Sequence, residues 1–130
     1  MHYVILLHLT INQFRLSSHE LLIETGRHQN IPRAYRMCQH CNMNIIEHEY
    51  NFLLVCQKCN IFRFKYLPRY DCHWPTLRKC NTLMSSTSPN TVNNLSKYLY
   101  VAFKERISVW LTDLCINENI FTFFKMKLYV

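Results

Sequence analysis

Four of the seven cysteines form two Cys-x-x-Cys pairs, Cys38/Cys41 and Cys56/Cys59, with fourteen residues between the pairs. Each pair places two sulfurs on one side of a tight turn. A second pair, brought back by the intervening chain, completes the four thiolate ligands that a tetrahedral zinc ion favours. The usual spacing between such pairs is roughly 15–20 residues, so this chain is one residue short of it. The pattern predicts a zinc site formed by Cys38, Cys41, Cys56 and Cys59.

Two other interpretations of these cysteines stay open. A reduced cysteine often behaves as a small buried apolar residue, so the four could be core residues that hold no metal. The sequence from Cys38 to Cys41 also has the spacing of a thioredoxin-like redox motif, which normally lies in a βαβ context. No βαβ pattern surrounds it here, which disfavours the redox interpretation.

Length and composition limit the classes of protein to which the chain can belong. It has 130 residues, which fits one domain, and a single glycine, Gly26. A β-barrel or sandwich needs many turn residues, so the scarcity of glycine predicts a mainly α fold, a small helical domain around the cysteine-rich zinc knuckle. The odd number of cysteines and the lack of a signal-peptide pattern predict an intracellular location, which includes the nucleus. The apolar opening MHYVILLHLTI is too short to span a bilayer, which needs ~20 residues.

Local patterns predict most of the elements that would position the cysteines. Residues 1–14 form a helix or a strand, and periodicity does not decide between the two. Ser17 or Ser18 is expected to cap a short helix that Gly26 ends, and Pro32 to begin an irregular segment. Helices are expected over 46–54, with Glu47 and Glu49 at the N-terminal end, and over 61–67, where a strand is the alternative. A polar loop over 84–94 precedes an amphipathic helix over 95–106.

A basic segment follows the cysteine pairs directly and carries aromatic residues between its cations. Aromatic rings can stack on unpaired bases while cations contact phosphates, which is how proteins commonly hold RNA and single strands. The formal net charge of +7 also favours a polyanionic partner. The segment therefore predicts binding to RNA or DNA, and the alternative is an aromatic core with a solvated charged surface. The predicted nucleic-acid-binding residues are Lys58, Arg63, Lys65, Arg69, Arg78 and Lys79.

Several of these segments together resemble the C-terminal tail of non-LTR retrotransposon polyproteins, downstream of the reverse transcriptase. The resemblance covers residues 13–106, and its most specific parts are IETGR, the first cysteine pair and IEHEYNFLLVC. The run CHWPT is also similar to the family. The resemblance implies a zinc-stabilised accessory module that binds nucleic acid, with Cys38, Cys41 and Cys56 as ligands. Segments 1–12 and 107–130 fall outside it and are expected to be separate ends of a domain over 13–106.

The chain departs from the family pattern at the fourth ligand. Asn51 stands where the family has its histidine, and an amide oxygen is a poor ligand for zinc. Cys59, three residues after Cys56, is the first replacement that the sequence offers. His48, three residues before Asn51, is the alternate fourth ligand. A third outcome is a decayed copy in which three ligands bind zinc weakly or not at all.

An enzyme is not expected. One glycine cannot form a glycine-rich phosphate loop, and the catalytic reverse transcriptase motifs, including the paired aspartates, are absent. No small-molecule substrate is therefore predicted, and the oligomeric state is left open. The function that the sequence favours is a zinc-stabilised nucleic-acid-binding module of a retrotransposon-derived protein. The alternatives are a decayed open reading frame with no selected activity and a small membrane-surface protein, which the apolar ends and positive charge suggest.

Overall fold

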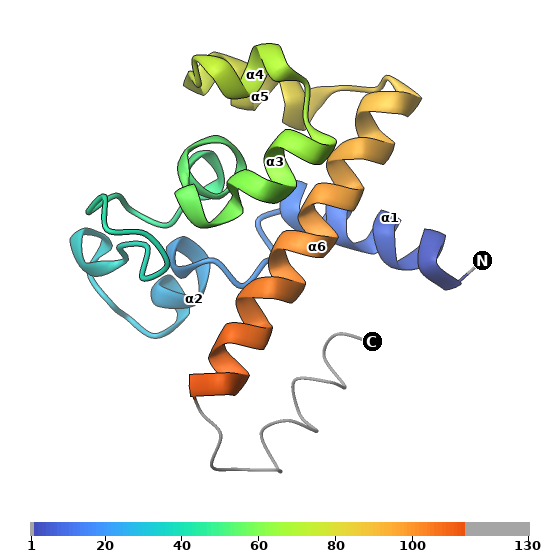
Figure 1. The fold of residues 1–130 in the computed structure, drawn as a ribbon. Helices are drawn as coiled ribbons and strands as arrows, with labels where there is room; N and C mark the ends of the chain where they lie inside the picture. The colour runs from blue at the N-terminus through green and yellow to red at the C-terminus, as the bar shows by residue number, and fades with distance from the viewer. Residues whose placement is uncertain (1, 114–130) are drawn as a thin grey trace.

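The computed structural model describes residues 2–113, with side chains up to Arg106. The described part is mainly helical and contains no β-strand, so the predicted mainly α fold is confirmed (Figure 1). Its only β-type pairing is an isolated bridge between Met37 and Ile46. The helical elements are α1 (His2–Arg15), α2 (Leu22–His28), η1 (Arg33–Tyr35), η2 (Asn51–Val55), η3 (Gln57–Cys59), α3 (Asn60–Tyr66), α4 (Arg69–His73), α5 (Leu77–Ser85) and α6 (Pro89–Asp113).

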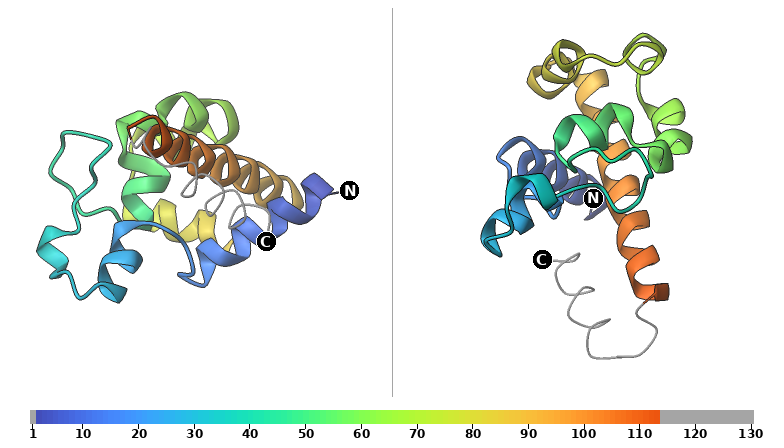
Figure 2. Two further views of the ribbon diagram at one scale, coloured as in Figure 1. Left: turned by 90° about the horizontal axis from the view of Figure 1, so that it is seen from below. Right: turned by 90° about the vertical axis from the view of Figure 1, so that its left-hand side faces the viewer.

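Helix α6 is the central element of the molecule. Both α1 and α3 pack against it, and the long orange helix runs between them in the views of Figures 1 and 2. The apolar stripe predicted for residues 95–106 faces the core, where Leu95, Tyr98, Leu99 and Ala102 are buried. The Tyr98 hydroxyl donates a hydrogen bond of 2.5 Å to the carbonyl oxygen of Phe52, which ties α6 to η2. The prediction of an amphipathic helix here is confirmed.

Residues 1–14, for which the sequence left helix or strand open, form α1. Leu7, Ile11 and Phe14 are buried, and the ring of Tyr3 contacts that of Tyr100 on α6, while Ile5 on the outer side is 54% exposed. The predicted boundary after residue 12 falls inside this helix, whose inner side packs on α6. At the other end, α6 extends through the predicted boundary at residue 107 as far as Asp113. The remainder of the predicted segment 107–130, from residue 114, lies outside the described residues.

Two predicted helix limits are wrong. Helix α2 begins at Leu22 without a serine cap, and Gly26 lies within it rather than at its end. The chain instead turns at Asn30, which has a positive φ of 57°. Gly26 is needed there for space, because a Cβ atom at this position would lie 2.8 Å from Cγ of Arg36.

The segment 46–54 is also less helical than predicted. Ile46 pairs with Met37, and the helical turn η2 begins at Asn51. The helix expected over 61–67 is confirmed as α3. The loop expected over 84–94 is shorter than predicted, because only the three residues 86–88 separate α5 from α6. Pro89 is the first residue of α6, a position that suits a residue with fixed φ and no backbone N–H. As expected, Pro32 begins an irregular stretch, the single turn η1.

Candidate metal centre and basic surface

Three of the four predicted cysteine ligands converge. The Sγ atoms of Cys38, Cys41 and Cys56 all lie within 4.8 Å of one another. Zn–S bonds of ~2.3 Å in a tetrahedron place two sulfurs about 3.8 Å apart, and the Sγ atoms of Cys38 and Cys56 are 3.9 Å apart. Cys38 and Cys56 are buried, and Cys41 is half-buried. The three cysteines are therefore compatible with a bound metal ion, and the sulfurs of Cys38 and Cys56 would not need to move to bind it.

Backbone hydrogen bonds hold the two sides of this cysteine group together. The N–H of Cys38 donates to the carbonyl of Ile45 at 2.8 Å, so the chain after Cys41 returns beside the first pair. The N–H of Cys56 donates to the carbonyl of Asn51 at 2.7 Å, which closes the π-helical turn η2 and directs Cys56 inward. The knuckle is therefore positioned by local backbone structure that sequence periodicity does not reveal.

Cys59 adjoins this group but is not one of its three mutually close sulfurs. Its thiol interacts with that of Cys56, and this hydrogen bond, aided by the charge of Arg106 against the effect of burial, lowers the pKa of Cys59 to about 6. The opposite occurs at Cys38, where the hydrogen bond with Cys56 and burial raise the thiol pKa. The four predicted cysteines therefore lie in one neighbourhood, with Cys59 on its Arg106 side.

The alternate ligand His48 is engaged elsewhere. Its Nδ1 accepts a hydrogen bond of 3.1 Å from the backbone N–H of Asn51, and its ring lies 5.9 Å from that of Tyr50. Asn51 is fully buried, and neither its Oδ1 nor its Nδ2 has a hydrogen-bond partner within the described part of the chain. A buried amide without partners costs stability, which marks position 51 as chemically unsatisfied beside the cysteine turn.

Arg106 is the residue of this centre that sequence reasoning missed. Although α6 lies far along the chain from the cysteines, the guanidinium reaches Cys38 Sγ and Cys59 Sγ at 3.8 Å each and Glu47 Oε2 at 2.7 Å. The available signal was an arginine that continues an apolar helical stripe, because a charge in such a position needs a buried partner. The sequence does not identify that partner.

The predicted nucleic-acid-binding residues divide into exposed and engaged cations. The side chains of Lys58, Lys65, Arg69 and Arg78 are exposed, on or beside α3, α4 and α5. Lys79 is half-buried, and its Nζ donates to the carbonyls of Tyr70 and Trp74 at 2.9 and 2.8 Å.

Arg63 does not belong to that surface. It is only 2% exposed, and its guanidinium donates to the carbonyl oxygens of Leu53, Phe52 and Cys56 and to Asn60 Oδ1. A side chain with every direction occupied by protein acceptors cannot reach a phosphate. Its prediction as a contact residue is corrected on this ground: Arg63 satisfies the carbonyls at the end of η2.

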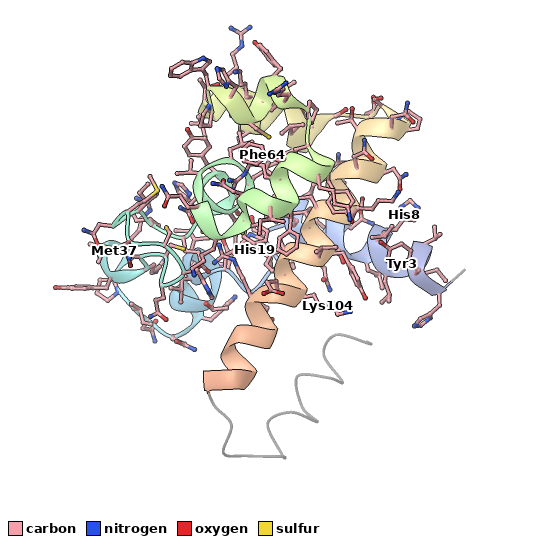
Figure 3. All side chains as sticks on the ribbon, in the orientation of Figure 1. Tyr3, His8, His19, Met37, Phe64 and Lys104 are labelled. Carbon is pink, nitrogen blue, oxygen red and sulfur yellow. The ribbon has the colours of Figure 1, made fainter. Side chains whose placement is uncertain are left out.

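Large exposed aromatic side chains lie on or beside the same helices as the exposed cations. Phe64, Tyr70 and Trp74 are 68%, 75% and 71% exposed, so they are not core residues. Figure 3 shows Phe64 on α3, the helix that precedes α4 and α5 in the chain. Phe62 and Tyr66, by contrast, are half-buried against the core. Only some of the aromatic residues that alternate with the cations are therefore free to contact a ligand.

Comparison with known proteins found no matching family model, no similar curated protein and no similar solved structure. Among the described residues, none of the helices combines the length and hydropathy needed to cross a bilayer.

Proposed function

We propose that this chain is a nucleic-acid-binding accessory module whose fold is closed by zinc. The observation that carries the proposal is the composition of the surface of α3, α4 and α5, where four cations and three large aromatic side chains are exposed. From residue 50 to residue 104 the sequence contains one acid, Asp71, which is buried. Exposed cations without nearby exposed carboxylates favour a polyanion, and exposed aromatic rings favour one with unpaired bases.

The cysteine group supports this surface by fixing the start of α3. Cys59 immediately precedes α3, and Lys58 lies between Cys56 and Cys59. Zinc held by Cys38, Cys41 and Cys56, with Cys59 as fourth ligand, would link the turn after η2 to the chain near Met37. Thiolate ligands and the sulfur separation suit zinc. Metal binding of this kind contributes on the order of 10 kcal/mol to folding, so the role of the metal is structural.

The resemblance to retrotransposon tails suggests which nucleic acids the chain would bind. A tail of a non-LTR retrotransposon polyprotein would act on the RNA of its element or on target DNA, while catalysis belongs to other parts of that polyprotein. The resemblance of IETGR and IEHEYNFLLVC to that family supports this proposed origin. In the structure these two segments are adjacent, because the backbone N–H of Ile23 donates to the carbonyl of Glu47 at 3.0 Å.

Fluorescence anisotropy with a labelled single-stranded RNA tests the nucleic-acid proposal. Arg69→Gln and Arg78→Gln should each weaken binding and reduce the slope of log affinity against log salt by about 0.7 per lost phosphate contact. Trp74→Ala should cost about 1–3 kcal/mol of binding free energy if a base stacks there. Arg33→Gln, which changes an exposed cation in η1 beside α2, is the matched control. Equal affinities for all four variants and the wild type would exclude this surface.

Cobalt(II) titration tests the metal and its fourth ligand. The wild type should show the charge-transfer absorption of thiolate-bound cobalt, and Cys56→Ser should abolish it. Cys72→Ser is the control, since its thiol donates to the carbonyl of Arg63 and is not one of the three converging sulfurs. Cys59→Ser should lower the affinity, and addition of Asn51→His should restore it, because a nitrogen ligand then replaces the missing sulfur. Unchanged binding by Cys59→Ser would instead favour His48.

An anionic membrane surface is a second candidate partner, which one feature of α1 favours. The helix exposes Val4, Ile5 and Leu9 by 42–54%, as expected of a helix that inserts shallowly at a lipid interface. Flotation with anionic liposomes discriminates between the two partners: Val4→Ser with Ile5→Ser should abolish flotation and leave RNA affinity unchanged.

A further inference from the structure

The guanidinium of Arg106, on α6, contacts one cysteine of each pair. Nη1 lies 3.8 Å from Sγ of Cys38, in the first pair, and Nη2 lies 3.8 Å from Sγ of Cys59, in the second. These distances suit hydrogen bonds to sulfur, which is larger than oxygen. One planar cation therefore contacts a sulfur from each of the two segments that a metal would join.

The orientation of Arg106 is fixed by two further contacts. Glu47 Oε2 accepts from Nη1 at 2.7 Å, and the ring of Phe52 lies 4.7 Å from Cζ of Arg106, within cation–π range. Arg106 is 8% and Glu47 4% exposed. A planar guanidinium held by a carboxylate and by an aromatic ring cannot rotate freely, so its outer nitrogens are held toward the sulfurs.

The positive charge of Arg106 can offset the negative charge of metal-bound thiolates. Cysteine binds a metal as a thiolate, and three or four thiolates around a divalent ion leave a net negative charge. In a buried site this charge is poorly solvated, and a nearby cation offsets it. Glu47 alone would repel the thiolates, whereas Arg106 attracts them. The ion pair with Glu47 alone would be enough to join α6 to residue 47. It does not explain why the guanidinium nitrogens of Arg106 also contact the sulfurs of Cys38 and Cys59.

We propose that Arg106 is a positioning residue of the metal centre, orienting the sulfurs of Cys38 and Cys59 and offsetting the charge of the thiolate set. The inference rests on the metal site proposed above and adds a role for α6 in it. The metal held by the middle of the chain is then coupled to a helix that begins thirty residues after the last cysteine of the pairs, at Pro89.

Two variants that break the same ion pair test this role, with cobalt(II) as the probe. Arg106→Gln removes the cation and should weaken cobalt binding by about 10- to 100-fold, the usual effect of losing a partner of a metal ligand. Glu47→Gln keeps the size and the acceptor for the N–H of Leu22 but removes a repulsive charge, so affinity should stay the same or rise. A purely structural ion pair predicts equal losses for both, and that result would overturn the proposal, as would equal affinity of Arg106→Gln and wild type.

A double variant covers the case in which Arg106→Gln alone does not fold, since it leaves Glu47 as an unpaired buried charge. Arg106→Gln with Glu47→Gln leaves neither charge of this ion pair and should still bind cobalt more weakly than Glu47→Gln. Equal affinity of these two variants would overturn the proposal. Arg106→Lys should recover part of the affinity and shift the cobalt charge-transfer band, because one ammonium cannot span both sulfurs. Absence of cobalt binding by the wild type removes the metal site itself, whereas equal affinities remove only the role of Arg106.

Discussion

At the scale of single residues, two buried arginines support different parts of the molecule. Arg106 faces sulfur and a carboxylate, whereas Arg63 faces carbonyl oxygens of η2 and of Cys56. The backbone carbonyls at the end of a helical turn have no partner within it, and the fork of five guanidinium donors satisfies several at once. Arg63 therefore acts as a side-chain cap for the turn that positions Cys56.

Replacement of Arg63 should affect stability more than binding. Arg63→Met removes the side-chain donor of the Leu53 carbonyl, while the carbonyls of Phe52 and Cys56 keep the Tyr98 hydroxyl and the Cys59 N–H. We expect a loss of about 1–3 kcal/mol in the free energy of unfolding, measured by urea denaturation of the metal-loaded protein. Arg69→Gln, on the exposed surface, should leave that free energy within about 0.5 kcal/mol of wild type and weaken RNA binding. A folded Arg63→Met protein with normal stability would contradict the assigned cap.

The pairing of Glu49 with His19 predicts a dependence on acid. Glu49 Oε1 lies 2.9 Å from His19 Nε2, and this hydrogen bond holds the pKa of Glu49 below its ordinary value of 4.5. Because the folded pKa is the lower one, the ionised carboxylate stabilises the fold above pH 4.5, and this stabilisation is lost as the pH falls through the folded pKa.

We expect the free energy of unfolding of the wild type to decrease more steeply below pH 4.5 than that of Glu49→Gln, which has no carboxylate to protonate. Urea denaturation across this pH range measures the difference. Parallel curves for the two proteins would show that the pair contributes nothing to the acid response.

The sequence predicts that the cysteines converge, but it does not predict which distant residues contact them. The Cys-x-x-Cys spacing is a local property, so the convergence of Cys38, Cys41 and Cys56 could be expected from the sequence. Glu47 was assigned to the start of its own helix, yet its carboxylate accepts from the N–H of Leu22 and pairs with Arg106. Both partners are distant in sequence, and no local pattern specifies such contacts.

At the scale of elements, the fit between α2 and the following chain depends on the absence of a side chain at residue 26. The guanidinium of Arg36 donates to the carbonyls of Ile31 and Ile23 at 2.8 and 3.1 Å, and its aliphatic stem lies across Gly26. The element therefore uses glycine for close approach in the middle of a helix, where alanine would otherwise be preferred.

Gly26→Ala should destabilise the protein by about 1–3 kcal/mol through overpacking, although the substitution raises intrinsic helix propensity. Arg36→Ala removes the obstructing stem, so the double variant Gly26→Ala with Arg36→Ala should be at least as stable as Arg36→Ala alone. Thermal denaturation of the four proteins measures this coupling. Additive losses would show that Arg36 does not limit the space at residue 26.

Sequence periodicity predicts an element well when one face of it is apolar and buried and the other face is polar and exposed. The stripe of α6 from Leu95 to Ala102 has one buried face and was predicted. Helix α1 was ambiguous because it is apolar on both its packed side and its exposed side. The predicted loop over 84–94 was too long because its serine, asparagine and threonine residues also suit helix ends, and α5 and α6 use them there.

At the scale of the whole molecule, charge is unevenly distributed along the chain. Residues 1–50 contain four acids and four arginines, so their formal charges cancel, whereas the exposed cations of α3–α5 follow the cysteines. The proposed zinc site lies at the junction of these parts. The metal would therefore hold together a part with no net charge and a basic part of the fold, whose packing otherwise depends mainly on α6.

Removal of the metal should accordingly loosen the whole domain. Addition of a chelator to zinc-loaded wild type should lower the midpoint of thermal unfolding, because a ligand at 100 times its dissociation constant stabilises the folded state by about 2.7 kcal/mol. Cys56→Ser should melt at the same temperature with and without chelator. Circular dichroism at 222 nm (a general probe of helix content) follows both. Identical melting of loaded and chelated wild type would indicate cysteines that serve only as core residues.

The packing of α1 against α6 joins the first described helix to the last one. During translation, α1 leaves the ribosome long before α6 has been made. The apolar side chains of Leu7, Ile11 and Phe14 therefore stay exposed to solvent until α6 can pack against them. The cysteines emerge between these two events, which would let a metal ion order the middle of the nascent chain first. Synthesis under zinc starvation should then prolong the interval in which α1 is open to chaperones or to aggregation.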